Sequence, residues 1–181
     1  MIKRLRPKYS DEQLAEIYKE PHDHSIFPDH ILRVDATLEL ANELIDDSDV
    51  FGADLSCGNA YILDKLRLPV KYYGDYAPKY TYCGPIERTL YEIPGVDVFV
   101  FCETIEHLDD PLAVLKAIRV KAKKLVLSTP LTHGYDDNLE HYWSFDKEGI
   151  LDLLQESGWT PELYAQTLPP LGYVFQIHGA T

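Results

Sequence analysis

The stretch Ala53-Asp54-Leu55-Ser56-Cys57-Gly58-Asn59-Ala60 decides the fold that we expect for this chain. The apolar run before it predicts a strand over residues 50–55, and a short helix is predicted from Tyr61 to Arg67. Small side chains in the turn between them let a ligand approach the backbone, and the first N–H groups of a helix are free to bind it. The signal is weak alone, because an ordinary tight turn between a strand and a helix has the same pattern.

An acidic residue at the end of the next predicted strand strengthens this interpretation. Asp75 follows the run 70–74 and lies 21 positions after Asp54. A carboxylate only accepts hydrogen bonds, so at this place it can bind both hydroxyls of a ribose. The turn and the acidic residue together indicate a ribose-containing ligand more strongly than either does alone.

Strands and helices alternate along the rest of the chain. The run Val96–Cys102 is almost entirely apolar, which is typical of a strand buried on both faces of a parallel sheet. We therefore predict an α/β domain whose strands end along one ligand-binding edge. Further strands are predicted at residues 70–74, 88–93, 125–129, 159–167 and 173–178, and helices after Ser10 and at residues 28–45, 111–122 and 146–155, with a loop at residues 130–143. The expected apolar stripe of the helix at 28–45 is Ile31, Val34, Leu38, Ala41, Leu44 and Ile45.

Composition limits the partners and the location that we expect. The chain has 181 residues, enough for one domain, and 17 Lys and Arg against 30 Asp and Glu give a net charge of −13. Such a charge disfavours nucleic acids and anionic membranes as partners. No apolar run has the length of a membrane span, and the N-terminal residues do not form a secretory signal. Three cysteines without a C-x-x-C pair argue against a disulfide framework and a Cys-rich zinc site, so we expect a cytoplasmic protein.

Four stretches, in order, resemble a class I S-adenosylmethionine-dependent methyltransferase. They are Asp54–Ala60, Gly74-Asp75, the segment Val96–Leu108 with Glu103, Glu106 and His107, and the C-terminal half from Leu125 through Glu140–Phe145 to Gly158-Trp159. The resemblance implies a three-layer, Rossmann-like α/β sandwich with a seven-stranded, mostly parallel sheet and an antiparallel last hairpin. It also implies S-adenosylmethionine as the cofactor and a small-molecule methyl acceptor. Residues 1–48 would form an N-terminal helical cap, and residues 49–181 the methyltransferase domain.

The same resemblance assigns cofactor-binding roles to individual residues. It implies that Asp54 orients the first-motif backbone and the cofactor amine, and that Asp75 binds the ribose. Tyr76 would flank the adenine and Ile86 would pack on it. The complete set of implied cofactor-binding residues is Asp54, Ser56, Cys57, Gly58, Asn59, Asp75, Tyr76, Ile86, Cys102 and Glu103.

Two departures from the family pattern keep other functions open. Ser56 and Ala60 stand where the family has its first and third glycines, and a positive φ at either would be strained. A degenerate member of the fold, with a binding role and no catalysis, is therefore one alternative. A nicotinamide-dependent oxidoreductase is another, although the missing third glycine argues against it.

Histidines supply the candidates for catalysis. His107 and His141 are the expected catalytic residues, because a histidine has a pKa near neutrality and can act as a general base. Each has an alternative structural role, in loop packing or in covering the sheet edge. The segment with His22, His24 and His30 resembles a metal-binding pattern, but we interpret it as part of a lid and expect no metal.

Overall fold

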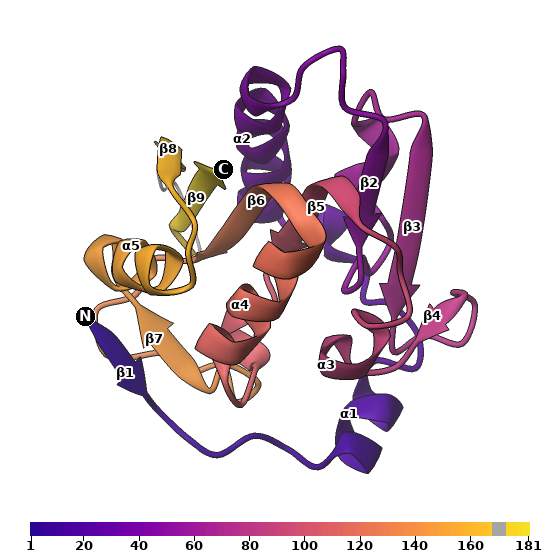
Figure 1. Cartoon of the computed structure of the whole chain (residues 1–181). Coiled ribbons are helices and arrows are strands. Elements are labelled where there is room, and N and C mark those ends of the chain that lie inside the picture. Colours follow the sequence, from indigo (N-terminus) through magenta and orange to yellow (C-terminus); the bar gives the residue numbers. More distant parts are fainter. Residues whose placement is uncertain (168–172) are drawn as a thin grey trace.

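A seven-stranded sheet forms the centre of the computed structural model, which describes residues 1–167 and 173–181 (Figure 1). The strands lie in the order β4-β3-β2-β5-β6-β9-β8. Neighbours from β4 to β6 pair in parallel, and β9 pairs antiparallel with both β6 and β8. The predicted mostly parallel sheet with an antiparallel last hairpin is thus confirmed. The bounds are β2 Phe51–Asp54, β3 Val70–Asp75, β4 Tyr82–Cys83, β5 Val96–Cys102, β6 Ala122–Pro130, β8 Pro161–Gln166 and β9 Phe175–Ala180.

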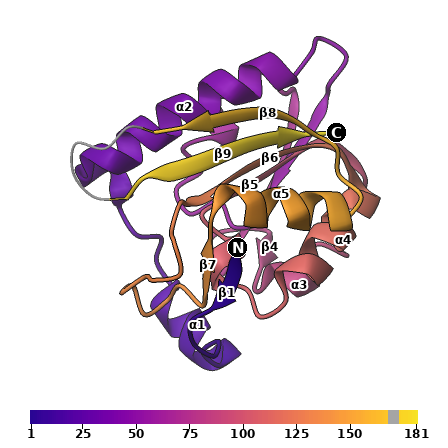
Figure 2. The ribbon, with the colours of Figure 1, turned by 90° about the vertical axis from the view of Figure 1, so that its left-hand side faces the viewer.

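Helices cover both faces of the sheet, so the predicted three layers are also confirmed (Figure 2). β5 shows why, because its side chains alternate between two apolar clusters and are fully buried on both sides. Val98 and Val100 pack towards α2 (Pro28–Leu44), whereas Phe99 and Phe101 pack with the other helices. Those helices are α3 (Ile86–Thr89), α4 (Pro111–Lys121) and α5 (Lys147–Glu156).

Local signals place the helix ends as predicted. Ser10 and Gln13 form a reciprocal capping box at the start of α1 (Asp11–Ile17). Asp146 caps α5 by accepting a hydrogen bond from the backbone of Gly149. After α5 the chain turns at Gly158, whose φ of 86° is the left-handed conformation that glycine adopts without strain.

Two predicted elements are wrong. The predicted helix over residues 61–67 is reduced to the 3₁₀ turn η2 (Leu63–Lys65), since Pro69 forces the chain into an extended path towards β3. The predicted strand over residues 88–93 is instead the end of α3 and a turn. Ile86, Leu90 and Ile93 are all buried, and this spacing of four and three residues is helical.

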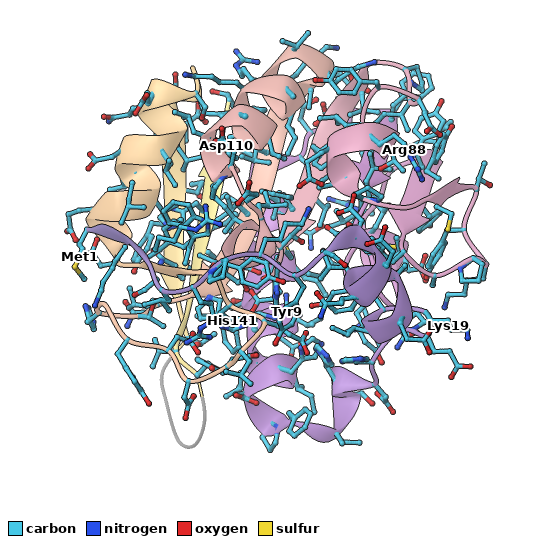
Figure 3. All side chains as sticks on the ribbon, turned by 90° about the horizontal axis from the view of Figure 1, so that it is seen from below. Met1, Tyr9, Lys19, Arg88, Asp110 and His141 are labelled. Atoms are coloured by element: carbon cyan, nitrogen blue, oxygen red, sulfur yellow. The ribbon has the colours of Figure 1, made fainter. Side chains whose placement is uncertain are left out.

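The N-terminal segment runs across the side of the molecule that Figure 3 shows, and several of its residues line the cavity described below. β1 (Ile2–Arg4) pairs antiparallel with β7 (Trp143–Phe145), a pairing that the sequence did not indicate. From there the chain passes Tyr9 and enters α1. α2 packs on the sheet itself, and the division into a cap, residues 1–48, and a domain, residues 49–181, stays a prediction. No described helix has the length and apolar character needed to cross a membrane.

Candidate active site

A cavity of about 600 Å³ lies at the edge where β2, β3 and β5 end. Strand ends meet there because parallel strands joined by crossovers all point the same way. Residues of the N-terminal segment close it from the opposite side: Lys8, Leu14, Tyr18, Pro21, His22, His24 and Phe27 line the cavity. Every predicted cofactor-binding and catalytic residue also lines it: Asp54, Ser56, Cys57, Gly58, Asn59, Asp75, Tyr76, Ile86, Cys102, Glu103, His107 and His141.

The turn after β2 is held by its own side chains and by β3. Asp54 is buried and accepts a 3.0 Å hydrogen bond from the backbone N–H of Ser56. The N–H of Cys57 donates to the carbonyl of Gly74 at 3.0 Å. Gly58 has a φ of 54°, and a Cβ built on it meets nothing within 4 Å, so this glycine leaves open space beside the backbone.

Ala60 carries the strain that its replacement of a glycine predicts. Its φ is 59°, in the left-handed region that an alanine avoids. Ser56 is not among the described residues with positive φ, so the serine at the first glycine position fits without that strain. Of the two replacements, therefore, only the one at Ala60 lies at a position with a positive φ.

Asp75 connects the end of β3 to this turn. Its Oδ2 accepts a 2.8 Å hydrogen bond from the N–H of Gly58. Burial raises the pKa of Asp75, and burial together with the nearby Asp75 charge raises the pKa of Asp54 to about 7. Two carboxyl groups thus share one buried edge, which favours a cationic ligand group close to them.

Apolar and aromatic groups lie beside Asp75. Ile86 is buried at the start of α3, and Tyr76 lies with its ring centroid 5.9 Å from that of Tyr18. Asn59 points the other way: its Nδ2 donates to the carbonyl of His22 at 3.1 Å and so joins the turn to the N-terminal segment. A planar ligand between Tyr76 and Ile86 would meet apolar surface.

The end of β5 brings a strained acidic residue to the cavity. Glu103 has a φ of 52°, and its Oε1 accepts a 2.8 Å hydrogen bond from the hydroxyl of Ser128. Cys102, before it, is a neutral thiol because burial raises its pKa to about 12. A left-handed glutamate is costly, and such conformations concentrate at functional sites.

Arg33, on α2, is a cavity residue that the sequence analysis missed. It is 4% exposed, and its guanidinium lies 3.9 Å from Oε1 of Glu103 and 5.8 Å from the ring of Phe175. One Nη donates to the hydroxyl of Ser128 at 3.3 Å, and the other contacts the ring nitrogens of His30. Nε has no hydrogen-bond partner in the part of the chain that the structure describes. Arg33 is thus ion-paired with Glu103 but has one buried N–H that no described group accepts.

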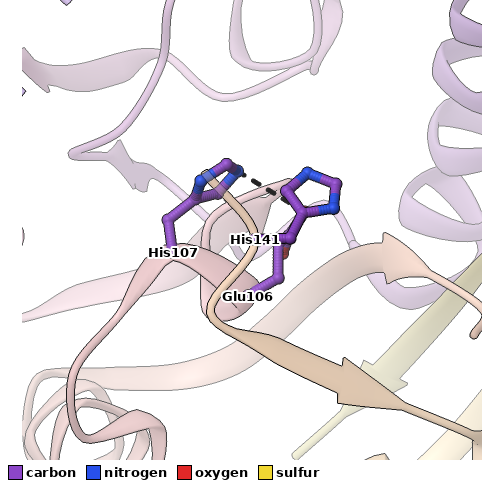
Figure 4. Close-up of side chains that lie close together, drawn as sticks. All are labelled: Glu106, His107 and His141. Carbon is purple, nitrogen blue, oxygen red and sulfur yellow. Dashed lines mark ion pairs between the residues drawn. The ribbon is translucent and has the colours of Figure 1, made fainter. Parts of the chain in front are cut away.

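Glu106, His107 and His141 meet at the far end of the cavity (Figure 4). η3 (Ile105–His107), directly after β5, supplies the first two, and the loop before β7 supplies His141. Nε2 of His107 lies 3.8 Å from Oε1 of Glu106. Nδ1 of His141 lies 2.7 Å from Oδ2 of Asp136, a carboxylate that the sequence analysis also missed.

The three groups have strongly altered acidities. Burial and, after it, the neighbouring His141 lower the pKa of His107 to about 3. Burial also lowers the pKa of His141, but the hydrogen bond to Asp136 and the charge of Glu106 outweigh it, so the pKa is raised. Burial and the charge of Glu103 raise the pKa of Glu106. Altered acidities of this kind are frequent where a protein does chemistry.

The histidines of the N-terminal segment lie near one another but not in the same cluster. The rings of His22 and His24 have centroids 5.9 Å apart, and those of His24 and His30 are 5.0 Å apart. Among the described residues, a group whose possible ligand atoms all lie within 4.8 Å of one another is Glu106, His107 and His141. His22, His24 and His30 line the cavity as parts of its wall.

Solved structures of methyltransferases resemble this chain, whereas no protein-family model and no curated protein sequence matches it. The 1,6-didemethyltoxoflavin-N1-methyltransferase of Burkholderia thailandensis, with 1,6-didemethyltoxoflavin and S-adenosylhomocysteine bound, is 16% identical with a TM-score of 0.69 over 99% of this chain and 93% of that one. An S-adenosylmethionine-dependent methyltransferase of Leishmania major is 13% identical, with a TM-score of 0.70 over 94% and 82%. The magnesium protoporphyrin IX methyltransferase of Synechocystis PCC 6803, with S-adenosylhomocysteine bound, is 14% identical, with a TM-score of 0.65 over 93% and 92%.

At these identities the likeness establishes the fold. The chain has the Rossmann-like fold of class I S-adenosylmethionine-dependent methyltransferases, as the sequence resemblance implied.

Proposed function

We propose that this chain is an S-adenosylmethionine-dependent methyltransferase that acts on a small molecule. The observation that carries the proposal is the turn after β2, whose Gly58 N–H donates a hydrogen bond to Asp75, both residues lining the cavity. Two of the similar structures named above hold S-adenosylhomocysteine, the product that methyl transfer leaves.

The cavity residues fit the chemical groups of this cofactor. Asp75 has free lone pairs for ribose hydroxyls, and the open space at Gly58 lets a ligand approach the backbone. Tyr76 and Ile86 offer apolar surface for the adenine. The incompletely satisfied Arg33 would bind the carboxylate of the amino-acid portion, and the buried carboxyl of Asp54 would face its ammonium group.

The bound cofactor supplies a methyl group on a positively charged sulfur, and that carbon is already electrophilic. The protein must therefore align an acceptor and receive its proton. His141 is our first candidate for this proton, because Asp136 fixes its ring by the 2.7 Å hydrogen bond to Nδ1. Its Nε2 can accept the proton once it gives up the 3.1 Å contact with Nδ2 of Asn138. His107 is the second, with Nδ1 at 2.9 Å from the carbonyl of Glu140.

The lining favours a small acceptor. Residues 1–48 contribute the wall opposite the strand ends, and we propose that this segment acts as a cap over cofactor and acceptor. Its histidines and tyrosine, with His107 and His141, suit a planar or hydroxylated molecule. The net charge of −13 disfavours a nucleic-acid substrate.

The two alternatives are weakened by specific observations. β9 is antiparallel and lies between β6 and β8, whereas the dinucleotide-binding fold has six parallel strands in the order 3-2-1-4-5-6, so a nicotinamide oxidoreductase is disfavoured. A degenerate binding protein is favoured only by the strain at Ala60.

Calorimetry and an acceptor screen test the proposal. We expect S-adenosylhomocysteine to bind and NAD to give no heat. Incubation with S-adenosylmethionine and pools of phenols, amines and heteroaromatic compounds should release S-adenosylhomocysteine. His141→Gln should keep the affinity for S-adenosylhomocysteine and lose roughly 10²–10⁴-fold in rate. Absence of S-adenosylhomocysteine binding would refute the function, and binding without turnover would favour the degenerate protein.

A further inference from the structure

Three side chains that line the cavity carry an inference beyond methyl transfer. In Glu106, His107 and His141 one ligand atom of each residue lies within 4.8 Å of the other two. Glu106 is 1% exposed and His141 is 6% exposed, so water competes little for these atoms. We infer that Glu106, His107 and His141 bind one divalent transition-metal ion.

Both imidazoles are fixed in the orientation that a metal requires. Nδ1 of His107 lies 2.9 Å from the carbonyl oxygen of Glu140, and Nδ1 of His141 lies 2.7 Å from the carboxylate of Asp136. Because a carbonyl and a carboxylate only accept, each Nδ1 carries the proton and each Nε2 has a lone pair. Metal-binding histidines typically have such an acceptor behind them.

The carboxylate of Glu106 is incompletely used by the protein. Oε2 accepts a 3.0 Å hydrogen bond from the hydroxyl of Thr129. Oε1 is buried, has no hydrogen-bond partner within residues 1–167 and 173–181, and lies 3.8 Å from Nε2 of His107. An unpaired buried carboxylate oxygen is costly, and a cation at this point would remove the cost.

One pair of ligand atoms, Nε2 of His107 and Oε1 of Glu106, lies close to metal-binding separation, whereas a pair at the 4.8 Å limit must shorten by more than about 1 Å when an ion binds. Metal bonds of about 2.0–2.2 Å place two ligand atoms about 3–3.5 Å apart, so the 3.8 Å pair needs little movement. Asn138 donates to Nε2 of His141 at 3.1 Å and would give up this hydrogen bond when the metal binds.

The donor set indicates the type of ion and its use. Two imidazoles and one carboxylate suit Zn²⁺, Mn²⁺, Fe²⁺ or Co²⁺ and leave coordination positions open towards the cavity. On the proposed function, an oxygen of the methyl acceptor would take an open position, and the ion would lower the pKa of that hydroxyl. His107 and His141 would then act through the ion and not as bases.

Titration of the metal-free protein with Co²⁺, followed by visible absorption, tests the site without any turnover. We expect one equivalent to bind and to give the bands of a nitrogen- and oxygen-ligated ion. Glu106→Gln and His141→Asn should lower the affinity at least about tenfold, and Asp136→Asn, which acts by positioning His141, about 10–100-fold. His133→Asn is the matched control, since His133 is exposed and lies outside the cavity lining.

Melting curves recorded without metal show whether each variant is folded. His24→Asn tests the other histidine group and should bind Co²⁺ as the unchanged chain does. Three outcomes would overturn the metal site. They are loss of Co²⁺ binding in His24→Asn, equal Co²⁺ affinity in Glu106→Gln and the unchanged chain, and no Co²⁺ binding by the unchanged chain. S-adenosylhomocysteine calorimetry on the same samples shows separately whether the proposed function holds.

Discussion

The backbone N–H of Gly58 donates a 2.8 Å hydrogen bond to Oδ2 of Asp75, which joins the turn after β2 to the end of β3. Oδ1 of the same carboxylate accepts from the N–H of Ala77 at 3.3 Å. Each carboxylate oxygen has two lone pairs, so Asp75 can still accept from ligand hydroxyls. A ligand therefore meets a carboxylate that is already fixed, and little ordering entropy is lost on binding.

Asp75→Asn should weaken binding of S-adenosylhomocysteine and of 5′-methylthioadenosine alike. Both contain the ribose, and loss of a charged acceptor costs about 1.5–3 kcal/mol, or about ten- to hundredfold in affinity. Calorimetry measures both affinities. Asp152→Asn, at an exposed position of α5, is the control. Unchanged affinity in Asp75→Asn would remove this residue from the site.

Arg33→Met should discriminate between the same two ligands. Only S-adenosylhomocysteine has the carboxylate that we assign to Arg33, so its affinity should fall about tenfold or more while that of 5′-methylthioadenosine changes little. Arg33→Lys keeps the charge and should recover part of the loss. Equal losses for both ligands would mean that Arg33 supports the cavity and does not bind the carboxylate.

Asp54 makes stability depend on pH. Burial raises its pKa to about 7, above the unfolded value, so the folded state holds the proton more tightly between these two values. The free energy of unfolding should therefore decrease as the pH rises from 4 to 7. Asp54→Asn removes this contribution, which is on the order of 2–4 kcal/mol. The stability of the variant, measured against that of the unchanged chain, should therefore be higher at pH 8 than at pH 5. Urea unfolding at the two pH values measures the difference, and the same pH response in both proteins would contradict it.

Ala60→Gly should stabilise the fold by about 0.5–1 kcal/mol. The left-handed φ of 59° costs alanine about 1–2 kcal/mol, and the entropy of glycine offsets part of the gain. Ala113→Gly, at an exposed position of α4, is the matched control and should destabilise by about 0.5–1 kcal/mol. Chemical denaturation distinguishes the two signs. Destabilisation by Ala60→Gly would show that the turn is unstrained.

Much of the fold could be predicted because its signals are local. Val96–Cys102 is β5 residue for residue, and the capping residues mark where α1 and α5 begin. The N-terminal pairing of β1 with β7 could not be predicted, since two three-residue strands more than 100 positions apart carry no periodicity.

The cavity-lining residues at the strand ends were predicted from the sequence, whereas those on α2 were missed. The expected stripe included Ile31, which is 48% exposed, whereas the buried face contains His30, Arg33 and Thr37. A prediction that considers only apolar residues assigns the wrong face of the helix to the core, because it ignores buried polar side chains. The spacing of three and four residues between His30, Arg33 and Thr37 is nevertheless typical of one helix face. Asp136 was missed because only the fold places it behind His141.

The pairing of β1 with β7 gives the N-terminal segment a second point of attachment. Residues 5–27 connect β1 to α2 and contribute several of the residues that line the cavity, so they form a strap attached at both ends and not a flap with one hinge. A strap has fewer conformations to lose when a ligand orders it. Disrupting the pairing of β1 with β7 would therefore lower the affinity for every ligand of the cavity by a similar factor, through entropy. Ile2, Lys3 and Arg4 would have this effect although they are not among the described residues that line the cavity.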